Sequence, residues 1–163
     1  MKTLINYSLA AGIIPYVKLN NTVFYLLGKE ISTDIWCGFV GNYKDMDISI
    51  TNTAIREFNE ETCFLYNDYI PTISKLVNKT IPIIVKKSKK NIYIYFVEFP
   101  ARFFNNSTTY NFNKIRYHLK INNKNNENNE YIEKYKLAWF SVNSLISNHD
   151  ILPSLKKIII NNN

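Results

Sequence analysis

The chain has 163 residues, the size of one ordinary globular domain, and a formal net charge of +7. Hydrophobic residues make up 46% and charged residues 20%, which excludes an intrinsically disordered chain. No apolar run approaches the roughly 18 residues of a membrane-spanning helix, and two cysteines, Cys37 and Cys63, are too few for a disulfide framework. We therefore expect a single domain, residues 1–163, in the cytoplasm.

Runs rich in Ile, Val, Tyr and Phe predict strands along much of the chain. The stretch before residue 17 has features of a signal peptide, but polar residues interrupt its apolar part, and we favour a strand there. Asn20 and Asn21 form a plausible hairpin turn between the first two strands. The predicted strands are 13–19, 22–27, 35–40, 81–85, 92–99 and 136–140, with an exposed turn over 86–90.

Helical patterns are fewer than strand patterns. Apolar residues at helical spacing predict a helix over 51–62, with Thr51 or Thr53 as its N-cap. A weaker pattern covers 110–120, and a last helix is predicted over 152–160. Strands interleaved with helices favour an α/β or α+β sandwich with a mixed sheet.

Two segments near the C-terminus predict irregular structure. An Asn-rich stretch at about 121–130 indicates an exposed loop, and residues 161–163 a short flexible tail. Pro153, which suits the first turn of a helix, marks where the last helix begins.

Charges are segregated along the sequence. Eight acids and three bases lie between Lys29 and Asp68, whereas Glu98 is the sole acid between residues 69 and 126. Part of the Lys excess reflects A/T-rich codons, which also explain the many Asn, Ile, Tyr and Phe residues. One region could hold a cation, and the other could face a polyanion.

The informative segment is Arg-Glu-Phe-Asn-Glu-Glu, residues 56–61. On a helix Glu57, Glu60 and Glu61 converge on one side, and Arg56 can pair with Glu60. Crowded carboxylates repel one another, and a hard cation such as Mg²⁺ or Mn²⁺ among them would relieve the repulsion. A solvated acidic helix face is the alternative, and spacing alone favours it slightly.

These residues and their surroundings resemble the Nudix hydrolase family, over roughly residues 10–145. The signature of that family is G-x5-E-x7-R-E-U-x-E-E-x-G-U, where U is a bulky apolar residue. Residues 56–61 match R-E-U-x-E-E, and Phe64 matches the final apolar position. The same resemblance extends to Trp36-Cys37-Gly38-Phe39-Val40-Gly41 and to the late Trp139-Phe140.

Other positions of the signature are degenerate. The unshifted frame puts Asn42 and Ile48 where Gly and Glu are expected. A frame shifted by one residue gives Gly41 and Asp47, and we prefer it because it restores a glycine and a carboxylate. Cys63 stands where the family has its last glycine.

The resemblance implies an α/β fold, a Nudix-like α/β/α sandwich with a mixed sheet. It implies hydrolysis of a nucleoside diphosphate linked to another group, with Mg²⁺ or Mn²⁺ as cofactor. The implied metal ligands are Glu57, Glu60, Glu61 and the Gly41 carbonyl, with Glu57 and Glu61 also catalytic. Arg56 and Asp47 are expected to support the site.

A general base outside the signature is expected by the same resemblance. Glu133, six residues before Trp139, is the first candidate, followed by Glu130 and Glu98. His118 and His149 show no metal-ligand spacing, and the two cysteines are expected to be small buried residues.

The substrate stays open. The chain is similar to decapping-type Nudix proteins of large DNA viruses, which implies capped RNA as substrate and, for a viral protein, the host cytoplasm. Aromatic residues could stack on the cap or on a nucleobase, and basic side chains could contact RNA phosphates. The phosphate-binding candidates are Lys86, Lys87, Lys89, Lys90 and Arg116. No membrane association and no obligate protein partner are expected.

Two alternatives belong to different classes. One is a Nudix hydrolase of small nucleotides: a dinucleoside polyphosphate, a nucleotide sugar or a nucleoside triphosphate. The other is a lapsed Nudix-like domain that binds RNA or a nucleotide, which the changes at Ile48 and Cys63 favour. The three retained glutamates count against the second alternative, because repelling acids without a cation have no evident purpose.

Overall fold

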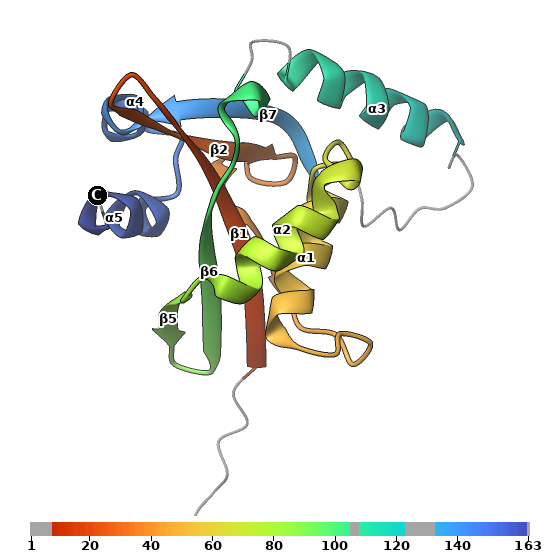
Figure 1. Cartoon of the computed structure of the whole chain (residues 1–163), viewed down its shortest axis with the longest axis vertical. Coiled ribbons are helices and arrows are strands. Elements are labelled where there is room, and N and C mark those ends of the chain that lie inside the picture. The colour runs from red at the N-terminus through yellow and green to blue at the C-terminus, as the bar shows by residue number, and fades with distance from the viewer. Residues whose placement is uncertain (1–7, 105–107, 123–132, 163) are drawn as a thin grey trace, which may run out of the picture.

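The computed structural model describes residues 8–104, 108–122 and 133–162 (Figure 1). The described residues form a seven-stranded mixed sheet with helices on both of its faces, so the expected α/β sandwich is confirmed. The strands are β1 (Ser8–Leu19), β2 (Thr22–Glu30), β3 (Trp36–Cys37), β4 (Phe39–Asn42), β5 (Ile83–Lys87), β6 (Lys90–Glu98) and β7 (Lys134–Ser141).

Strand β1 organises the sheet because it pairs with three other strands. Its first half pairs antiparallel with β4, its second half antiparallel with β2, and it runs parallel to β6. Strand β7 pairs with β2, and β5 with β6. β1 begins at Ser8, five residues before the predicted start, because residues 8–16 pair with β6. This pairing satisfies backbone N–H and C=O groups, and a local sequence pattern does not reveal it.

Two further predictions concern the strands of the N-terminal half, one about a turn and one about a strand. Asn20 and Asn21 both have positive φ, 46° and 62°, which confirms the hairpin turn between β1 and β2. The single strand predicted over 35–40 is wrong, because the chain changes partner at Gly38. Strand β3 pairs with β2, whereas β4 pairs with β1.

The helices are α1 (Ile50–Glu61), α2 (Ile70–Lys79), α3 (Thr108–Asn122), α4 (Val142–Ser147) and α5 (Pro153–Asn161), with short 3-10 turns η1 (Asn67–Tyr69) and η2 (Ala101–Phe103). Pro153 opens α5 as predicted. Helices α2 and α4 were not predicted. The last helix continues through Asn161, the first residue of the predicted tail.

Helix α1 is fixed at both ends. Ser49 is the N-cap, and its Oγ accepts a hydrogen bond from the Asn52 amide at 3.2 Å, so the prediction of Thr51 or Thr53 is wrong. At the other end the Cys63 amide donates to the Glu60 carbonyl and the Phe64 amide to the Asn59 carbonyl, each at 2.8 Å. This pattern normally places glycine where Cys63 stands, and Cys63 adopts the required left-handed conformation, φ 52°.

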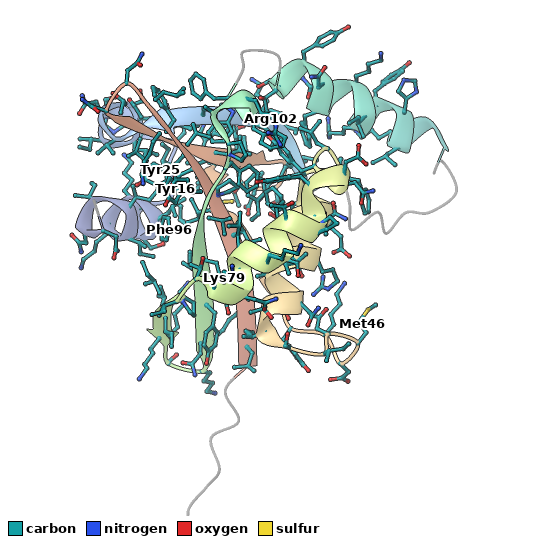
Figure 2. All side chains as sticks on the ribbon, viewed as in Figure 1. Tyr16, Tyr25, Met46, Lys79, Phe96 and Arg102 are labelled. Atoms are coloured by element: carbon teal, nitrogen blue, oxygen red, sulfur yellow. The ribbon has the colours of Figure 1, made fainter. Side chains whose placement is uncertain are left out.

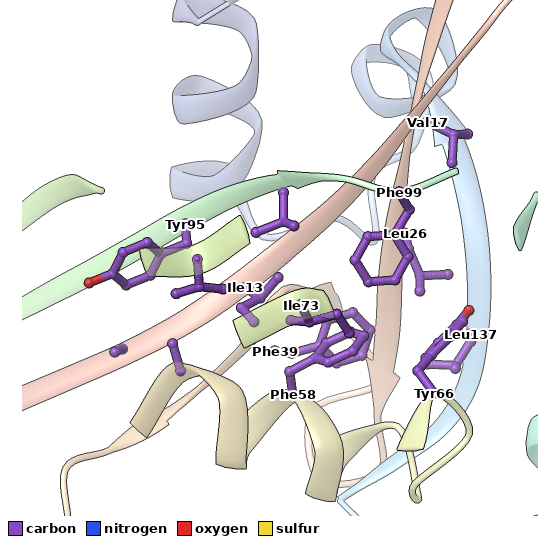
Figure 3. Close-up of a cluster of buried hydrophobic side chains, with 14 of the residues drawn as sticks. Ile13, Val17, Leu26, Phe39, Phe58, Tyr66, Ile73, Tyr95, Phe99 and Leu137 are labelled. Atoms are coloured by element: carbon purple, nitrogen blue, oxygen red, sulfur yellow. The ribbon is translucent and has the colours of Figure 1, made fainter. Parts of the chain in front are cut away.

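The main core lies between the sheet and helices α1 and α2. Figure 3 shows Phe58 of α1 directed into this core beside Phe39 and Tyr66. The ring centroid of Phe58 lies 5.2 Å from that of Phe39, 5.6 Å from that of Tyr66 and 5.8 Å from that of Phe99. Phe58 and Ala54 are fully buried, and Glu57 and Glu61 are buried beside them on the flank of the same helix.

The second face of the sheet packs against α5. Ile14, Leu27 and Ile94 of the sheet form a smaller buried cluster with Leu155 and Ile159 of that helix. None of the described helices is long and apolar enough to cross a membrane. The predicted Asn-rich loop lies outside the described residues from position 123 onward, as do Glu130 and residue 163, while positions 121 and 122 end α3.

Candidate active site

Arg56 is the centre of the candidate site. Its Nη1 donates to Glu57 Oε1 at 2.7 Å and to Glu60 Oε2 at 3.0 Å, which confirms the predicted pairing with Glu60. Its Nε and Nη2 donate to the two carboxylate oxygens of Asp47, at 2.8 and 2.9 Å. Nη2 also donates to the Asn42 carbonyl at 2.9 Å. One guanidinium is therefore shared by three carboxylates and joins the loop after β4 to helix α1.

Asp47 is held in this loop by several donors. Besides Arg56, the Thr53 hydroxyl donates to it at 2.9 Å and the Lys44 amide at 3.0 Å. The hydrogen bonds from Arg56 are the main cause that lowers the pKa of Asp47 to about 2. Ile48, by contrast, is 92% exposed. The carboxylate of the shifted frame thus lies against Arg56, and the residue of the unshifted frame points to solvent.

Gly41 lies directly against Glu57. A Cβ at Gly41 would stand 2.1 Å from Cδ of Glu57 and 2.2 Å from its Oε2, so any side chain there would force the Glu57 carboxylate to move. Glu57 itself is 9% exposed, and burial raises its pKa. β4 therefore forms a cradle for the carboxylate of Glu57.

Glu61 is the deepest of the three glutamates, at 2% exposure. Its Oε2 lies 3.5 Å from Nζ of Lys134 and accepts no hydrogen bond from the described residues. Burial raises the pKa of Glu61 to about 8, opposed by the Lys134 ammonium and reinforced by Glu133 and Glu57. Sequence reasoning missed Lys134, because its position at the start of a strand carries no signal that distinguishes it from a surface lysine.

A cavity of about 330 Å³ opens beside the carboxylates. The residues that line it are Val40, Gly41, Asn42, Lys44, Glu57, Glu60, Lys90 and Glu133. Two lysines and three glutamates thus face one space, which suits a ligand that carries phosphates together with a cation.

Of the three candidates for a general base, the structure brings only Glu133 to this cavity among the described residues. Glu98 lies at the far end of β6, where Lys18 donates to it at 2.9 Å and Tyr16 at 3.1 Å. Figure 2 shows Tyr16 near Tyr25 and Phe96 by the sheet face that α5 covers, whereas Met46 marks the loop after β4. Glu98 therefore does not belong to the candidate site.

The predicted phosphate-binding residues do not form one surface. Lys86, Lys87 and Lys89 are exposed, but the predicted turn over 86–90 is too long, because Lys86 and Lys87 pair with β6 as part of β5. Lys90 lines the cavity, and its Nζ donates to Oδ1 of Asn42 at 2.6 Å. Arg116 lies on α3, at the opposite end of the molecule from this hairpin (Figure 1).

A second cavity, of about 170 Å³, lies on the sheet face toward α5. Val40 of strand β4 lines both cavities, one toward α5 and the other beside α1. Ile14, Ile92 and Ile94 give the second cavity apolar walls, and Glu30 and Cys37 add polar atoms. An apolar space with a few polar groups is the usual form of a site for a flat ring.

The donor chemistry of the site fits a hard divalent cation. Glu57, Glu60 and Glu61 offer carboxylate oxygens, one of them buried without a hydrogen-bond donor, beside the cradle at Gly41. In the arrangement shown, Arg56 and Lys134 engage these carboxylates, and no three His, Cys, Asp or Glu side chains of the described ranges are grouped as metal ligands. The two bases therefore share with a bound cation the task of balancing the charge of these carboxylates.

The remaining candidates for metal or nucleophilic chemistry do not join the cluster. His118 and His149 are exposed, and Cys37 and Cys63 are buried, as expected. Burial raises the pKa of Cys37 to about 12 and that of Cys63 to about 11, which disfavours the thiolate.

No protein-family model matches the sequence, and no curated protein matches it either. Solved structures are similar over nearly the whole chain. A hydrolase of the NUDIX family from Clostridium perfringens has a TM-score of 0.55 at 14% identity, covering 96% of this chain and 95% of that chain. The C. elegans Ap4A hydrolase, in a binary complex, has a TM-score of 0.54 at 14% identity, covering 94% and 93%.

The NUDIX domain of Shewanella oneidensis NrtR, complexed with ADP ribose, has a TM-score of 0.54 at 9% identity, covering 94% of this chain and 84% of that chain. At such low identity these likenesses establish the fold alone. The chain has the Nudix fold, which confirms the architecture that the sequence resemblance implied.

Asp47→Asn should destabilise the protein in a pH-dependent way. The native pKa of Asp47 is about 2 against an ordinary value of 3.8, so the ionised form stabilises the fold above pH 4, by about 2 kcal/mol at roughly 1.4 kcal/mol per pKa unit. That contribution is lost as the pH falls from 4 through 2. Urea unfolding of both proteins at pH 7, 4 and 2.5 measures it. A difference in unfolding free energy that stays constant with pH would contradict the assignment.

Gly41→Ala should displace Glu57 and weaken Mn²⁺ binding by about tenfold, the lower range for loss of a supporting contact around a metal. The added Cβ would overlap Glu57 Cδ at 2.1 Å. Gly38→Ala is the matched control, since the nearest atoms to its Cβ would belong to Ile14, at 3.1 Å or more, and Val40, at 3.7 Å, and none to the carboxylates. Isothermal titration with Mn²⁺ compares the variants. Equal affinities would remove Gly41 from the site.

Proposed function

We propose that this protein is a Nudix pyrophosphohydrolase, which hydrolyses a phosphoanhydride bond in a nucleotide substrate. The observation that carries the proposal is the joint lining of one cavity by Glu57, Glu60 and Glu133 with Lys44 and Lys90. This chemistry needs carboxylates that hold a cation and ammonium groups that bind phosphates. Acids alone could be a solvated helix face, and lysines alone could be ordinary surface residues.

The side chains of the cavity divide the work. Lys44 and Lys90 attract the phosphates and hold them beside helix α1. Bound Mg²⁺ or Mn²⁺, held by Glu57, Glu60, Glu61 and the Gly41 carbonyl, would offset the phosphate charge and lower the pKa of a bound water. Glu133 would accept the proton of the attacking water. Arg56 keeps Glu57 and Glu60 oriented.

The nucleoside is proposed to occupy the second cavity. Its walls are apolar, it shares the lining residue Val40 with the first cavity, and Glu30 and Cys37 supply polar atoms that could meet the edge of a base. A substrate placed in this way would have its ring between the sheet and α5 and its phosphates beside α1.

The substrate that we favour is the 5′ cap of an RNA, as in viral decapping proteins, which places the protein in the cytoplasm of a cell. Lys86, Lys87 and Lys89 lie next to Lys90, where an RNA chain leaving the cavity could meet them. Helix α3 offers a second basic surface without any acid, on which Tyr110 and Tyr117 are exposed at 67% and 65%. Hydrolysis would release methylated guanosine diphosphate and leave a 5′-monophosphate RNA.

A small nucleotide is the second candidate substrate. Its support is the similarity to an Ap4A hydrolase and to a NUDIX domain complexed with ADP ribose. This candidate predicts turnover without RNA and little dependence of the rate on salt.

A lapsed domain that binds a nucleotide or RNA is the third candidate, and one observation favours it. Arg56 and Lys134 balance the glutamates without any metal. The three acids therefore have a structural explanation, which weakens the argument that their retention counts against a lapsed domain.

An assay with Mg²⁺ or Mn²⁺ distinguishes the three candidates. Cap-labelled RNA is compared with a dinucleoside polyphosphate, a nucleotide sugar and nucleoside triphosphates. Glu60→Gln should reduce hydrolysis of the true substrate by about 100-fold or more, as loss of a group that stabilises developing charge does, with an unchanged melting temperature. Glu98→Gln is the matched control, because Glu98 lies at the far end of β6.

Release of the methylated diphosphate from RNA alone would support decapping, and turnover of a free nucleotide alone would support the second candidate. Binding without turnover of any substrate would support the lapsed domain. Full activity of Glu60→Gln would overturn the proposed site.

Glu133→Gln tests the general base. The rate constant kcat should fall by about 100-fold, within the range for a general base, while KM changes little, because Glu133 is assigned to the chemical step. A bell-shaped pH–rate profile should lose its acidic limb. An unchanged kcat, or a change confined to KM, would remove Glu133 from this role.

A further inference from the structure

Lys134 is the most deeply buried charged side chain among the described residues, at 1% exposure. Its Nζ lies 3.1 Å from Glu30 Oε1, 2.9 Å from Cys37 Sγ and 3.5 Å from Glu61 Oε2. Burying an ammonium is costly unless carboxylates and hydrogen bonds surround it. Its partners come from β2, β3 and α1, so the side chain joins the sheet to the end of the carboxylate helix.

The surrounding backbone makes room for this lysine. A Cβ at Gly28 would stand 3.0 Å from both Cγ and Cδ of Lys134, closer than nearly all side chains pack. The pairing of β2 with β7 also shifts register beside Glu30, which places Lys134 opposite that glutamate. The absence of a side chain at Gly28 and the register shift beside Glu30 therefore allow the Lys134 side chain to extend to Glu61.

Arg56 and Lys134 serve different carboxylates. Arg56 binds Glu57, Glu60 and Asp47. Among the ion pairs of the described residues, Glu61 pairs with Lys134. The Oε2 atom of Glu61 accepts no hydrogen bond from those residues. The orientation of Glu61 therefore depends on Lys134.

We propose that Lys134 is a positioning residue, which holds the carboxylate of Glu61 in the orientation that a divalent cation requires. The proposal rests on the proposed function, because it assumes that Glu61 is a metal ligand. Glu30 and Cys37 also line the second cavity, so Lys134 connects the wall of the proposed nucleoside site with the metal-binding helix.

The test is Mn²⁺ binding by the free protein, followed by electron paramagnetic resonance of the unbound ion. Lys134→Met should weaken Mn²⁺ binding by about tenfold or more, as loss of a partner that orients a metal ligand does. Lys29→Met is the matched control. Lys29 is also buried, at 9% exposure, but pairs with Asp34 at 3.0 Å and Asp150 at 3.5 Å. Its affinity for Mn²⁺ should equal that of the wild type.

A double variant separates positioning from general damage to the fold. In a Glu61→Gln background, Lys134→Met should change the Mn²⁺ affinity by less than about twofold, because residues that act through one contact are not additive. A purely structural effect would multiply with that of Glu61→Gln. If Lys134→Met does not fold, Glu30→Gln combined with Lys134→Met removes both charges of a partly buried pair and carries the same expectation.

The outcomes are distinct. Mn²⁺ binding by Lys134→Met equal to or tighter than wild type would overturn the proposal and leave the proposed function standing. Independent, multiplying effects in the double variant would overturn it as well. Absence of Mn²⁺ binding by the wild-type protein would reject the metal site itself, and with it the role of Lys134. Weakened binding that depends on Glu61 would establish the role.

Discussion

The candidate site depends on the single guanidinium of Arg56, which is shared among three carboxylates and a backbone carbonyl. It ties the Asn42 carbonyl, at the end of β4, and Asp47, in the loop that follows, to Glu57 and Glu60 on α1. Such charge-assisted contacts are among the stronger hydrogen bonds in proteins. Because one positive charge serves three negative ones, the cluster retains an excess of negative charge toward the cavity. The loop and the helix therefore form one unit, and a displacement of either would open the site.

The charge of the remaining glutamate, Glu61, is balanced by a lysine of the protein itself. Glu61 faces Lys134, and both side chains are almost fully buried. A row of acids on a helix consequently does not by itself require a metal. The lysines of the cavity add the second part of the argument, because Lys44 and Lys90 line an open space in which ammonium groups suit phosphates.

The sheet explains how acidic and basic parts of the sequence meet. Strand β1 pairs with β4 on one edge and with β6 on the other. Ala10 pairs with Asn42 across one edge and with Ile92 across the other, so the start of β6 lies near the end of β4. Lys90 can therefore donate to Asn42 although 48 positions separate them in the chain. Charge that is segregated in sequence becomes mixed at one cavity.

The sequence alone determined the features that depend on near neighbours. Helical periodicity placed Glu57, Glu60 and Glu61 together on one flank of α1 and directed Phe58 into the core, and the Asn20-Asn21 pair specified a hairpin turn. The pairing of Arg56 with Glu60 followed from their spacing of four residues. Residue types that match a known signature at fixed intervals also led to the correct fold.

Tertiary structure decided what depends on distant partners. Two residues, Asp47 and Ile48, could both have filled one position of the signature, and the contact with Arg56 selects Asp47. The early start of β1 follows from its pairing with β6, and the early N-cap of α1 from the side chain of Ser49. Lys134 gave no signal in the sequence, because the burial of a lysine depends on carboxylates and a glycine that other strands and a helix bring to it. Local periodicity fixes which way a side chain faces, but only the packed sheet fixes what it faces.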